Sequence, residues 1–335
     1  MKRRGDLFLL LAPAALLAAA AAGLRLGPQR LSLEELLSPA GADLLEMRAL
    51  RVLLAAAVGA SLAVAGVIFQ AILRNPLADP YVLGASSGAG LGAALAIVGA
   101  PVVGLSLSLG PWAFGAWGIA LAAFAGAALA VLVVYRLALV SGQMPRLTLL
   151  LAGVVVGYVL GAMLLFIVST VGSSRLHSVM WWLLGSLQAK EPGLVTAAWF
   201  LAALGVAAAW LLARDLDLLA LGEERAAHLG LSPEGAKRLF FGIGSLLTAG
   251  AVSSSGMIGF VGLVVPHLVR LLIGPGHRRL VPCAAFAGAT FLVLVELVSR
   301  SALPGREIPI GVVTAFVGGP FFLWLLRRKR RSLWC

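Results

Sequence analysis

The sequence predicts an all-α polytopic membrane protein with about ten transmembrane helices. Hydrophobic residues make up 61% of the 335 residues, only 12% are charged, and the mean hydropathy is +1.01. The apolar runs are long and continuous, whereas the strands of a membrane barrel would alternate lipid-facing and lumen-facing residues. We therefore expect a single transmembrane domain over residues 1–335.

The first five apolar runs approach or reach the length needed to cross a bilayer. They predict helices near residues 6–24, 49–73, 81–100, 112–135 and 147–170. The first run has the basic head and apolar core of a signal peptide. We predict that it is retained as a helix, because the chain that follows is itself membrane-embedded.

The segment 171–193 is too polar at both ends and too short in its middle to span. We expect it on the outer (periplasmic) interface, with Trp181 and Trp182 at headgroup depth. Five further helices are predicted at about 194–213, 237–254, 257–273, 281–299 and 309–326, the last one ending in the basic run RRKRR.

The polar segment 214–238 interrupts this pattern with nine charged residues. Each charge would cost about 2.5–3.5 kcal/mol at the centre of a membrane helix, so the segment lies in water. A short helix is predicted over 223–229 and ended by Gly230, and Ser232 is predicted to cap the next helix. A solvated loop would satisfy this pattern, but the leucines at 218, 219, 221, 229 and 231 provide apolar surface on which a partner could dock.

The distribution of Lys and Arg orients the chain in the membrane. Basic residues are more numerous on the side that holds residues 2–4, the polar segment and the C-terminal run. The positive-inside rule therefore places both termini and the polar segment in the cytoplasm. The net charge of +12 is accounted for by this topology, and we do not expect nucleic-acid binding.

Motifs of enzyme chemistry are few. The chain has neither a P-loop sequence nor an H-E-x-x-H sequence, and its two cysteines have no metal-site or disulfide spacing. We expect a transport subunit that is not an enzyme and that binds no cofactor or metal. Glu296 and His267 are the main ionisable residues inside predicted spans. They make a poor proton relay, and a packing role is equally open.

Four separated stretches resemble, in order, the signature segments of the FecCD-type permeases. They are RNPLADPYVLGASSGAG (74–90), ERAAHLGL (224–231), GMIGFVGLVVPHLVR (256–270) and EIPIGVVTAFVGGPFFLWLL (307–326). These permeases are the membrane subunits of type II ATP-binding-cassette importers for ferric siderophores, haem and vitamin B12. The resemblance runs from about Arg48 to the C-terminus.

The resemblance implies partners for the chain. It implies a ten-span permease in the cell inner membrane that pairs with a second copy of itself, with the passage at the dimer axis. Two cytoplasmic ATPase subunits, which bind the ATP and Mg²⁺, would dock on the polar segment, and a periplasmic or lipid-anchored binding protein would deliver the substrate.

The resemblance also implies roles for individual residues. The residues that couple to the ATPase would be Leu218, Leu221, Glu223, Glu224, Arg225, Ala226, His228, Leu229, Gly230 and Leu231. Arginines at the outer mouth would receive carboxylates of the binding protein, and Arg48, Arg51, Arg300 and Arg306 are the candidates. At the first two of these positions the family usually has Pro before the second arginine, where this chain has Leu50.

The cytoplasmic gate and the path are assigned in the same way, to Asn75, Leu77, Arg146, Leu147 and Thr148, with Ser86 and Ser87 as polar contacts along the passage. A break at Asn-Pro suits a gate, because its freed backbone groups must line water or protein. The first substrate guess is a ferric siderophore, with haem and cobalamin next, and His177 is expected to be solvated rather than a haem ligand. The alternative function is a gradient-driven secondary transporter without an ATPase.

Overall fold

The computed structural model describes residues 2–27, 39–99, 115–188 and 191–330. Within these residues the chain forms thirteen α-helices, one 3-10 helix and no strand beyond two isolated bridges, so the predicted fold class is confirmed. Residues 100, 112–114 and 189–190 of the predicted segments, and Cys335, lie outside the described residues. The helices are α1 (Lys2–Arg25), α3 (Pro39–Ile72), η1 (Pro80–Leu83), α4 (Ala85–Gly99), α5 (Ala116–Ala138), α6 (Arg146–Thr170), α7 (Ser173–Leu183), α8 (Pro192–Leu211), α9 (Ala213–Leu221), α10 (Glu223–His228), α11 (Pro233–Ser255), α12 (Val261–Ile273), α13 (His277–Ser301) and α14 (Ile310–Arg330).

Ten of these helices correspond to the ten predicted spans. Six are long and apolar enough to cross a membrane: α1, α3, α5, α6, α8 and α13. Three apolar helices, α4, α12 and α14, are shorter in their apolar part. The tenth is α11, which is 23 residues long and carries its charges in its first turns.

The structure departs from the predicted boundaries where polar and apolar residues mix. Helix α3 begins at Pro39, ten residues before the predicted start. The polar segment holds an additional amphipathic helix, α9, whose Leu216 and Leu219 are buried. The outer segment forms a helix, α7, over Ser173–Leu183. Ser232 does lie at the N-cap of α11, but its side chain makes no capping hydrogen bond.

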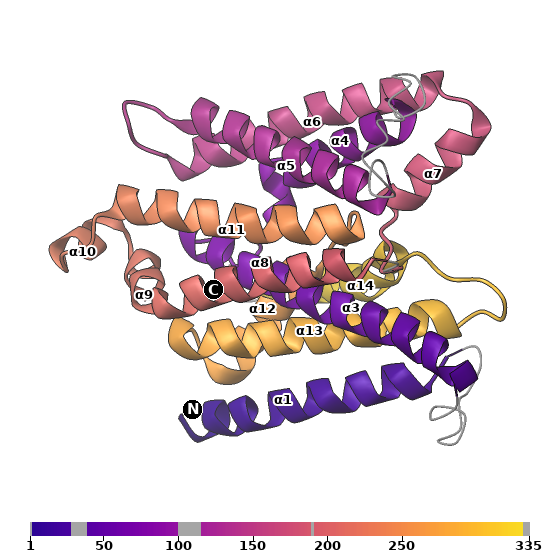
Figure 1. The fold of residues 1–335 in the computed structure, drawn as a ribbon. Coiled ribbons are helices and arrows are strands. Elements are labelled where there is room, and N and C mark those ends of the chain that lie inside the picture. The colour runs from indigo at the N-terminus through magenta and orange to yellow at the C-terminus, as the bar shows by residue number, and fades with distance from the viewer. Residues whose placement is uncertain (1, 28–38, 100–114, 189–190, 331–335) are drawn as a thin grey trace.

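Helix α3 lies at the centre of the molecule and packs against α8, α11, α12 and α13 (Figure 1). In its most apolar window 94% of the residues are buried, compared with 11% in α6. The N-terminus, α9 and α10 lie at one end of the molecule, and the connection between α13 and α14 lies at the other, as the predicted topology requires (Figure 1).

Pairs of glycines allow these helices to touch backbone to backbone. A Cβ added to Gly59 of α3 would lie 2.2 Å from the carbonyl oxygen of Gly288 in α13, and one added to Gly288 would lie 2.3 Å from the carbonyl oxygen of Gly59. Gly88 of α4 and Gly126 of α5 form a second pair of the same kind. Membrane helices are held together largely by such close packing, because lipid gives little hydrophobic force between them.

Substitution of Gly59 by alanine therefore tests the packing of the core. We expect Gly59→Ala to lower the temperature of thermal unfolding, since overpacking of this kind costs about 1–3 kcal/mol. Gly161→Ala in α6 is the matched control, because a Cβ at Gly161 meets no atom within 4 Å. Equal unfolding temperatures for the two purified variants would contradict the close contact.

Candidate functional site

The predicted cytoplasmic gate is a structured turn between α3 and η1. The side chain of Asn75 accepts a hydrogen bond from the backbone N–H of Leu77 (3.0 Å), and that of Asp79 accepts one from Tyr81 (2.8 Å). Arg74 has a positive φ of 46° and Gly84 one of 80°. Asn75 satisfies an N–H group of the turn itself, and Asp79 caps the start of η1. Side-chain acceptors of this kind let an irregular segment lie beside a membrane.

Ser86 and Ser87 lie at the start of α4 and are half-buried. The Ser87 hydroxyl faces α6, because a Cβ on Gly157 would lie 3.6 Å from its oxygen. Residues 84–88, GASSG, have the spacing of a hydrolase nucleophile turn, which joins a strand to a helix. Here they join a 3-10 helix to an α-helix, so the context that this motif needs is missing.

An ion-pair network joins the polar segment to the start of α6. Glu223 of α10 accepts a hydrogen bond from Arg146 (2.8 Å) and lies 3.2 Å from the ammonium of Lys237 in α11. Lys237 also donates to the carbonyl oxygen of Met144 (3.1 Å) and pairs with Glu234, which in turn accepts from the backbone N–H of Met144. The side chain of Lys237 is only 3% exposed. We call these five residues the cytoplasmic cluster, after the side on which the sequence predicts the polar segment.

The four charged residues of the cytoplasmic cluster line an open pocket of about 710 Å³ together with Arg74, Leu147 and Leu221. Leu147 is exposed, and Thr148 beside it is half-buried. The gate turn, the start of α6 and the polar segment therefore meet at one pocket. The sequence predicts a gate role for the first two segments and a coupling role for the third, but it does not indicate that they touch.

Most of the predicted coupling residues form an exposed surface. Leu221, Glu224, Arg225, His228, Leu229 and Gly230 are exposed, and Leu218, Glu223 and Leu231 are half-buried. Ala226 is the buried residue of α10, and its coupling role stays a prediction. Leu219 also points inward, which makes the exposed apolar surface smaller than the five leucines suggested. Gly230, with a φ of +86°, follows the C-cap of α10 as predicted.

A second contact fixes the other half of the polar segment to α13. Asp217 of α9 accepts the backbone N–H of His277 (2.9 Å), and the same carboxylate oxygen lies 2.6 Å from its Nδ1. Burial raises the pKa of Asp217, but the hydrogen bonds from His277 outweigh it and the pKa is lowered. The carboxylate caps the N-terminus of α13, where its charge is favourable.

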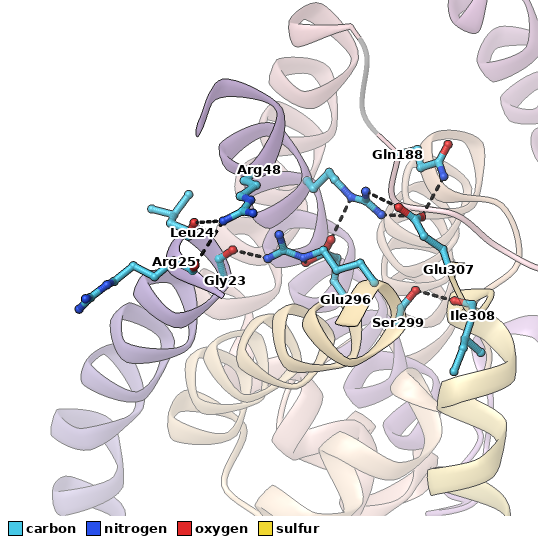
Figure 2. Close-up of polar contacts among 11 residues, drawn as sticks. Gly23, Leu24, Arg25, Arg48, Gln188, Glu296, Ser299, Glu307 and Ile308 are labelled. Carbon is cyan, nitrogen blue, oxygen red and sulfur yellow. Dashed lines mark hydrogen bonds and ion pairs between the residues drawn. The ribbon is translucent and has the colours of Figure 1, made fainter. Parts of the chain in front are cut away.

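Charged residues also gather near the connection between α13 and α14, at the end predicted to be the outer one; Figure 2 shows their contacts. Arg51 of α3 makes two hydrogen bonds of 2.8 Å to the carboxylate of Glu307, and its Nε lies 2.9 Å from Glu296. Arg300 lies one helical turn after Glu296 and pairs with it at 3.1 Å. Gln188, in the connection between α7 and α8, donates to Glu307 (2.9 Å). Arg51, Glu296, Arg300 and Glu307 are the outer cluster.

Two of the predicted docking arginines bind the C-terminal carbonyl groups of α1. Arg48 donates to Leu24 (2.9 Å) and Arg25 (3.3 Å), and Arg300 donates to Gly23 (Figure 2). The last carbonyls of a helix have no partner within it, and cations are favourable there. Arg48 and Arg300 are 4% and 3% exposed, so these contacts are internal.

The docking role of the four arginines stays a prediction. Arg48, Arg51 and Arg300 are engaged with α1, Glu296 and Glu307, so docking through them requires these internal contacts to be exchanged. Arg306, on the connection between α13 and α14, is exposed. The sequence does not indicate that Glu307 is a partner of Arg51. The spacing of Glu296 and Arg300, four residues apart on one helix, was the available signal for their pair.

Neither cluster resembles a metal site. Among the described residues no group of three or more His, Cys, Asp or Glu side chains is arranged to hold a metal ion. His177 is exposed on α7, and its ring stacks on that of Trp181 with centroids 5.9 Å apart. This stacking is a surface contact within α7, and the expectation that His177 binds no haem stays a prediction.

Comparisons with known proteins agree with this arrangement. The FecCD transport family model matches residues 15–328. The chain is 44% identical to the cobalamin import system permease protein BtuC of Halobacterium salinarum, over 84% of this chain and 73% of that protein. It is 39% identical to the hemin transport system permease protein HmuU of Yersinia pestis, over 86% and 84%. A solved structure described as an inward-facing metal-chelate type ABC transporter matches with a TM-score of 0.84 and 29% identity, covering 96% of this chain and 99% of that one.

The outer cluster predicts a pH dependence of stability. The hydrogen bonds from Arg51 lower the pKa of Glu307, while burial opposes them and Gln188 adds to them. A carboxylate with a lowered folded-state pKa stabilises the fold fully above its unfolded pKa and loses this effect as the pH falls through the folded value. We expect wild type to unfold at a higher temperature than Glu307→Gln at neutral pH, and the difference to disappear only well below about pH 4.3. Glu224→Gln, at an exposed carboxylate, is the control; a difference for Glu307→Gln that stayed constant with pH would contradict the ion pair.

Proposed function

The chain belongs to the FecCD transport family, and we propose that it is the permease subunit of an ATP-binding-cassette importer that moves a metal chelate into the cytoplasm by alternating access. The relatives are named as permease proteins of import systems, in agreement with a transport subunit that is not itself an enzyme. In this proposal two copies of the chain enclose the passage in the inner membrane, and two cytoplasmic ATPase subunits bind and hydrolyse the ATP.

The observation that carries the mechanism is the position of Glu223. One oxygen of its carboxylate binds Arg146, the first residue of α6, and the other faces Lys237 in α11. Glu223 itself is the first residue of α10, whose exposed surface is the proposed ATPase contact. A push on α10 is therefore passed directly to α6, which continues to Leu147 and Thr148 at the proposed gate.

The pairs of Lys237 suit this transmission because its ammonium is buried and its charge is costly to leave without a partner, whereas Arg146 and Glu223 are partly exposed. Removal of one partner of a buried pair costs about 3–5 kcal/mol, since the remaining charge is left without compensation. Lys237 is buried and is held by two carboxylates and a backbone carbonyl. The connection between α5 and α6 is attached to this lysine at Met144, so it moves with α11.

The outer end of the proposed path would receive the binding protein. Arg306 is exposed there, and Arg51 reaches the surface through its pair with Glu307, whose side chain is 32% exposed. Arginine binds carboxylates in a two-bonded geometry, and Arg51 already does so with Glu307. An acidic partner would engage Arg306 first and compete with Glu307 for Arg51.

Gradient-driven transport is the weaker alternative, and the surroundings of Glu296 bear on it. Such a transporter needs a carboxylate that exchanges protons or ions along the path. Both oxygens of Glu296 lie within 3.1 Å of an arginine nitrogen, and the side chain is 0% exposed. These contacts favour a structural role for Glu296 over that of a carrier.

The chemistry of the cargo is proposed at the level of a bulky metal chelate. A ferric siderophore was the first guess from the sequence, but the names of the relatives cited above favour a tetrapyrrole such as cobalamin or haem. We propose that the binding protein selects the cargo.

Neutralisation of Glu223 tests the transmission step. In proteoliposomes with the ATPase and binding protein, we expect Glu223→Gln to retain ATP hydrolysis and to lose at least tenfold in chelate transported per ATP, because α10 would no longer be tied to α6. Asp215→Asn, an acid of α9 outside the cytoplasmic cluster, should transport normally. Unchanged transport by Glu223→Gln would exclude Glu223 as the connection.

The source of energy separates the two functions. We expect cobalamin or haem uptake by the reconstituted complex to require ATP inside the cytoplasmic compartment and to persist when an uncoupler dissipates the proton gradient. Uptake by the permease without an ATPase, abolished by the uncoupler, would establish the gradient-driven alternative. Substitution of Glu296 is a poorer test, since it would leave Arg51 and Arg300 buried without their partner and destabilise the fold under either function.

A further inference from the structure

A groove runs between α5 and α11 on the outside of the helix bundle. These two helices lie side by side (Figure 1). Side chains from both line the groove, which has a volume of about 380 Å³. Its walls are mostly apolar, with Phe124 and Leu132 from α5 and Phe241 and Leu246 from α11. Arg238 closes one end. Nothing in the proposed transport mechanism uses this groove.

The length of the groove matches one leaflet of a bilayer. It extends from Tyr135 back to Phe124 on α5 and from Arg238 to Ala249 on α11, which is eleven residues along each helix. At 1.5 Å per residue this is about 16 Å, about half of a hydrocarbon core that is about 30 Å thick. An acyl chain of one leaflet spans the same depth.

The ends of the groove differ as the ends of a lipid do. Arg238 lies in the second turn of α11, beside the connection between α5 and α6, and its guanidinium donates to the carbonyl oxygen of Gly142. Arg238 is exposed, and no carboxylate of the described residues pairs with it. A guanidinium has five N–H donors, so donors remain for a phosphate. Tyr135, at the same end, is a residue type common at the membrane interface.

The groove opens onto the surface that faces the bilayer. Leu129 and Leu132 of α5 are 62% and 49% exposed, and Leu239 of α11 is 50% exposed. Gly242 lies in the groove and a Cβ there would meet no atom within 4 Å, so the space beside it is open to a ligand. Large exposed apolar side chains on membrane helices contact hydrocarbon.

We propose that this groove is a binding site for an anionic phospholipid of the cytoplasmic leaflet, with one acyl chain between α5 and α11 and the phosphate on Arg238. The assignment to the cytoplasmic leaflet rests on the proposed topology. Cationic residues at the cytoplasmic ends of membrane helices are the usual partners of such headgroups. The lipid would bridge α5 and α11 next to the connection that carries Met144 and Arg146, so its presence would stiffen the support of the cytoplasmic cluster.

Native mass spectrometry of the full chain tests the site. The protein is released from nanodiscs that contain equal amounts of phosphatidylglycerol and phosphatidylethanolamine, and the retained lipid is identified. We expect wild type to retain one phosphatidylglycerol in preference. In Arg238→Gln this preference should fall about fivefold, the ratio that corresponds to about 1 kcal/mol per basic residue. In Gly242→Leu, where the leucine fills the groove, retention of either lipid should be lost.

Two controls separate the groove from the general lipid belt. Arg278→Gln removes another exposed arginine at the cytoplasmic end of a membrane helix, and Gly161→Leu adds the same side chain at an open glycine of α6. Both should bind lipid as wild type does. Thermal unfolding checks the fold of each variant, and Ala128→Leu fills the groove from α5 should Gly242→Leu unfold.

Equal lipid ratios in wild type, Arg238→Gln and Arg278→Gln would overturn the phosphate contact. Equal retention in Gly242→Leu, Ala128→Leu and Gly161→Leu would overturn the groove as the site. The lipid assay requires neither ATP nor cargo, so its result can be interpreted even where the proposed transport function is wrong. Retention of phosphatidylglycerol by the groove in a protein that transports by a gradient would still establish the lipid site.

Discussion

Backbone contact between helices is the constraint on which the rest of this structure depends. In lipid the helices gain little from hiding apolar side chains, so they must gain from close packing. Gly59 lies against Gly288, and a Cβ on Gly66 would lie 1.9 Å from the carbonyl oxygen of Gly262. These contacts place α12 and α13 directly on α3 and leave α3 almost wholly buried. These closely packed helices position the ion pairs at both ends of the molecule. Arg51 of the outer cluster comes from α3, and its partner Glu296 comes from α13, which Gly59 and Gly288 hold against α3.

The break after α3 is possible only because these closely packed helices surround it. A helix that stops within a membrane protein exposes carbonyl and N–H groups that lipid cannot satisfy. In the segment after α3, Asn75 and Asp79 accept the N–H groups of Leu77 and Tyr81, and Arg74 lies next to Gly222 beside the pocket of the cytoplasmic cluster. The irregular backbone is thus placed where protein and water can both reach it. A turn of this kind could open and close the proposed gate without unfolding a helix.

The sequence was sufficient for the spans and for the order of the motifs, because bilayer thickness fixes the length of an apolar run. It was less informative where a helix is amphipathic and short: α9 was read as part of a polar connection, although Leu216 and Leu219 are buried. Lys237 was counted among the charges that keep the polar segment in water, and it is buried by its partners. Arg51 and Glu307 are 256 residues apart, and no local pattern in one sequence predicts such a pair. The contacts of these residues therefore could not be predicted from the sequence, and the roles assigned to them stay predictions.

The two helices of the polar segment are attached to different parts of the molecule. Helix α9 is bound through Asp217 to the start of α13, a helix of 25 residues that reaches about 37 Å to the outer cluster. Helix α10 is bound through Glu223 to α6 and α11. Gly222 joins them with a φ of +117°, a conformation that strains other residues. A force on α10 can therefore rotate α10 about Gly222 while α9 stays bound to α13. In the proposed transport cycle, α13 is the helix that must keep its position. The contact of Asp217 with His277 at one end of α13 and the ion pairs of Glu296 and Arg300 at the other are placed where they resist its rotation.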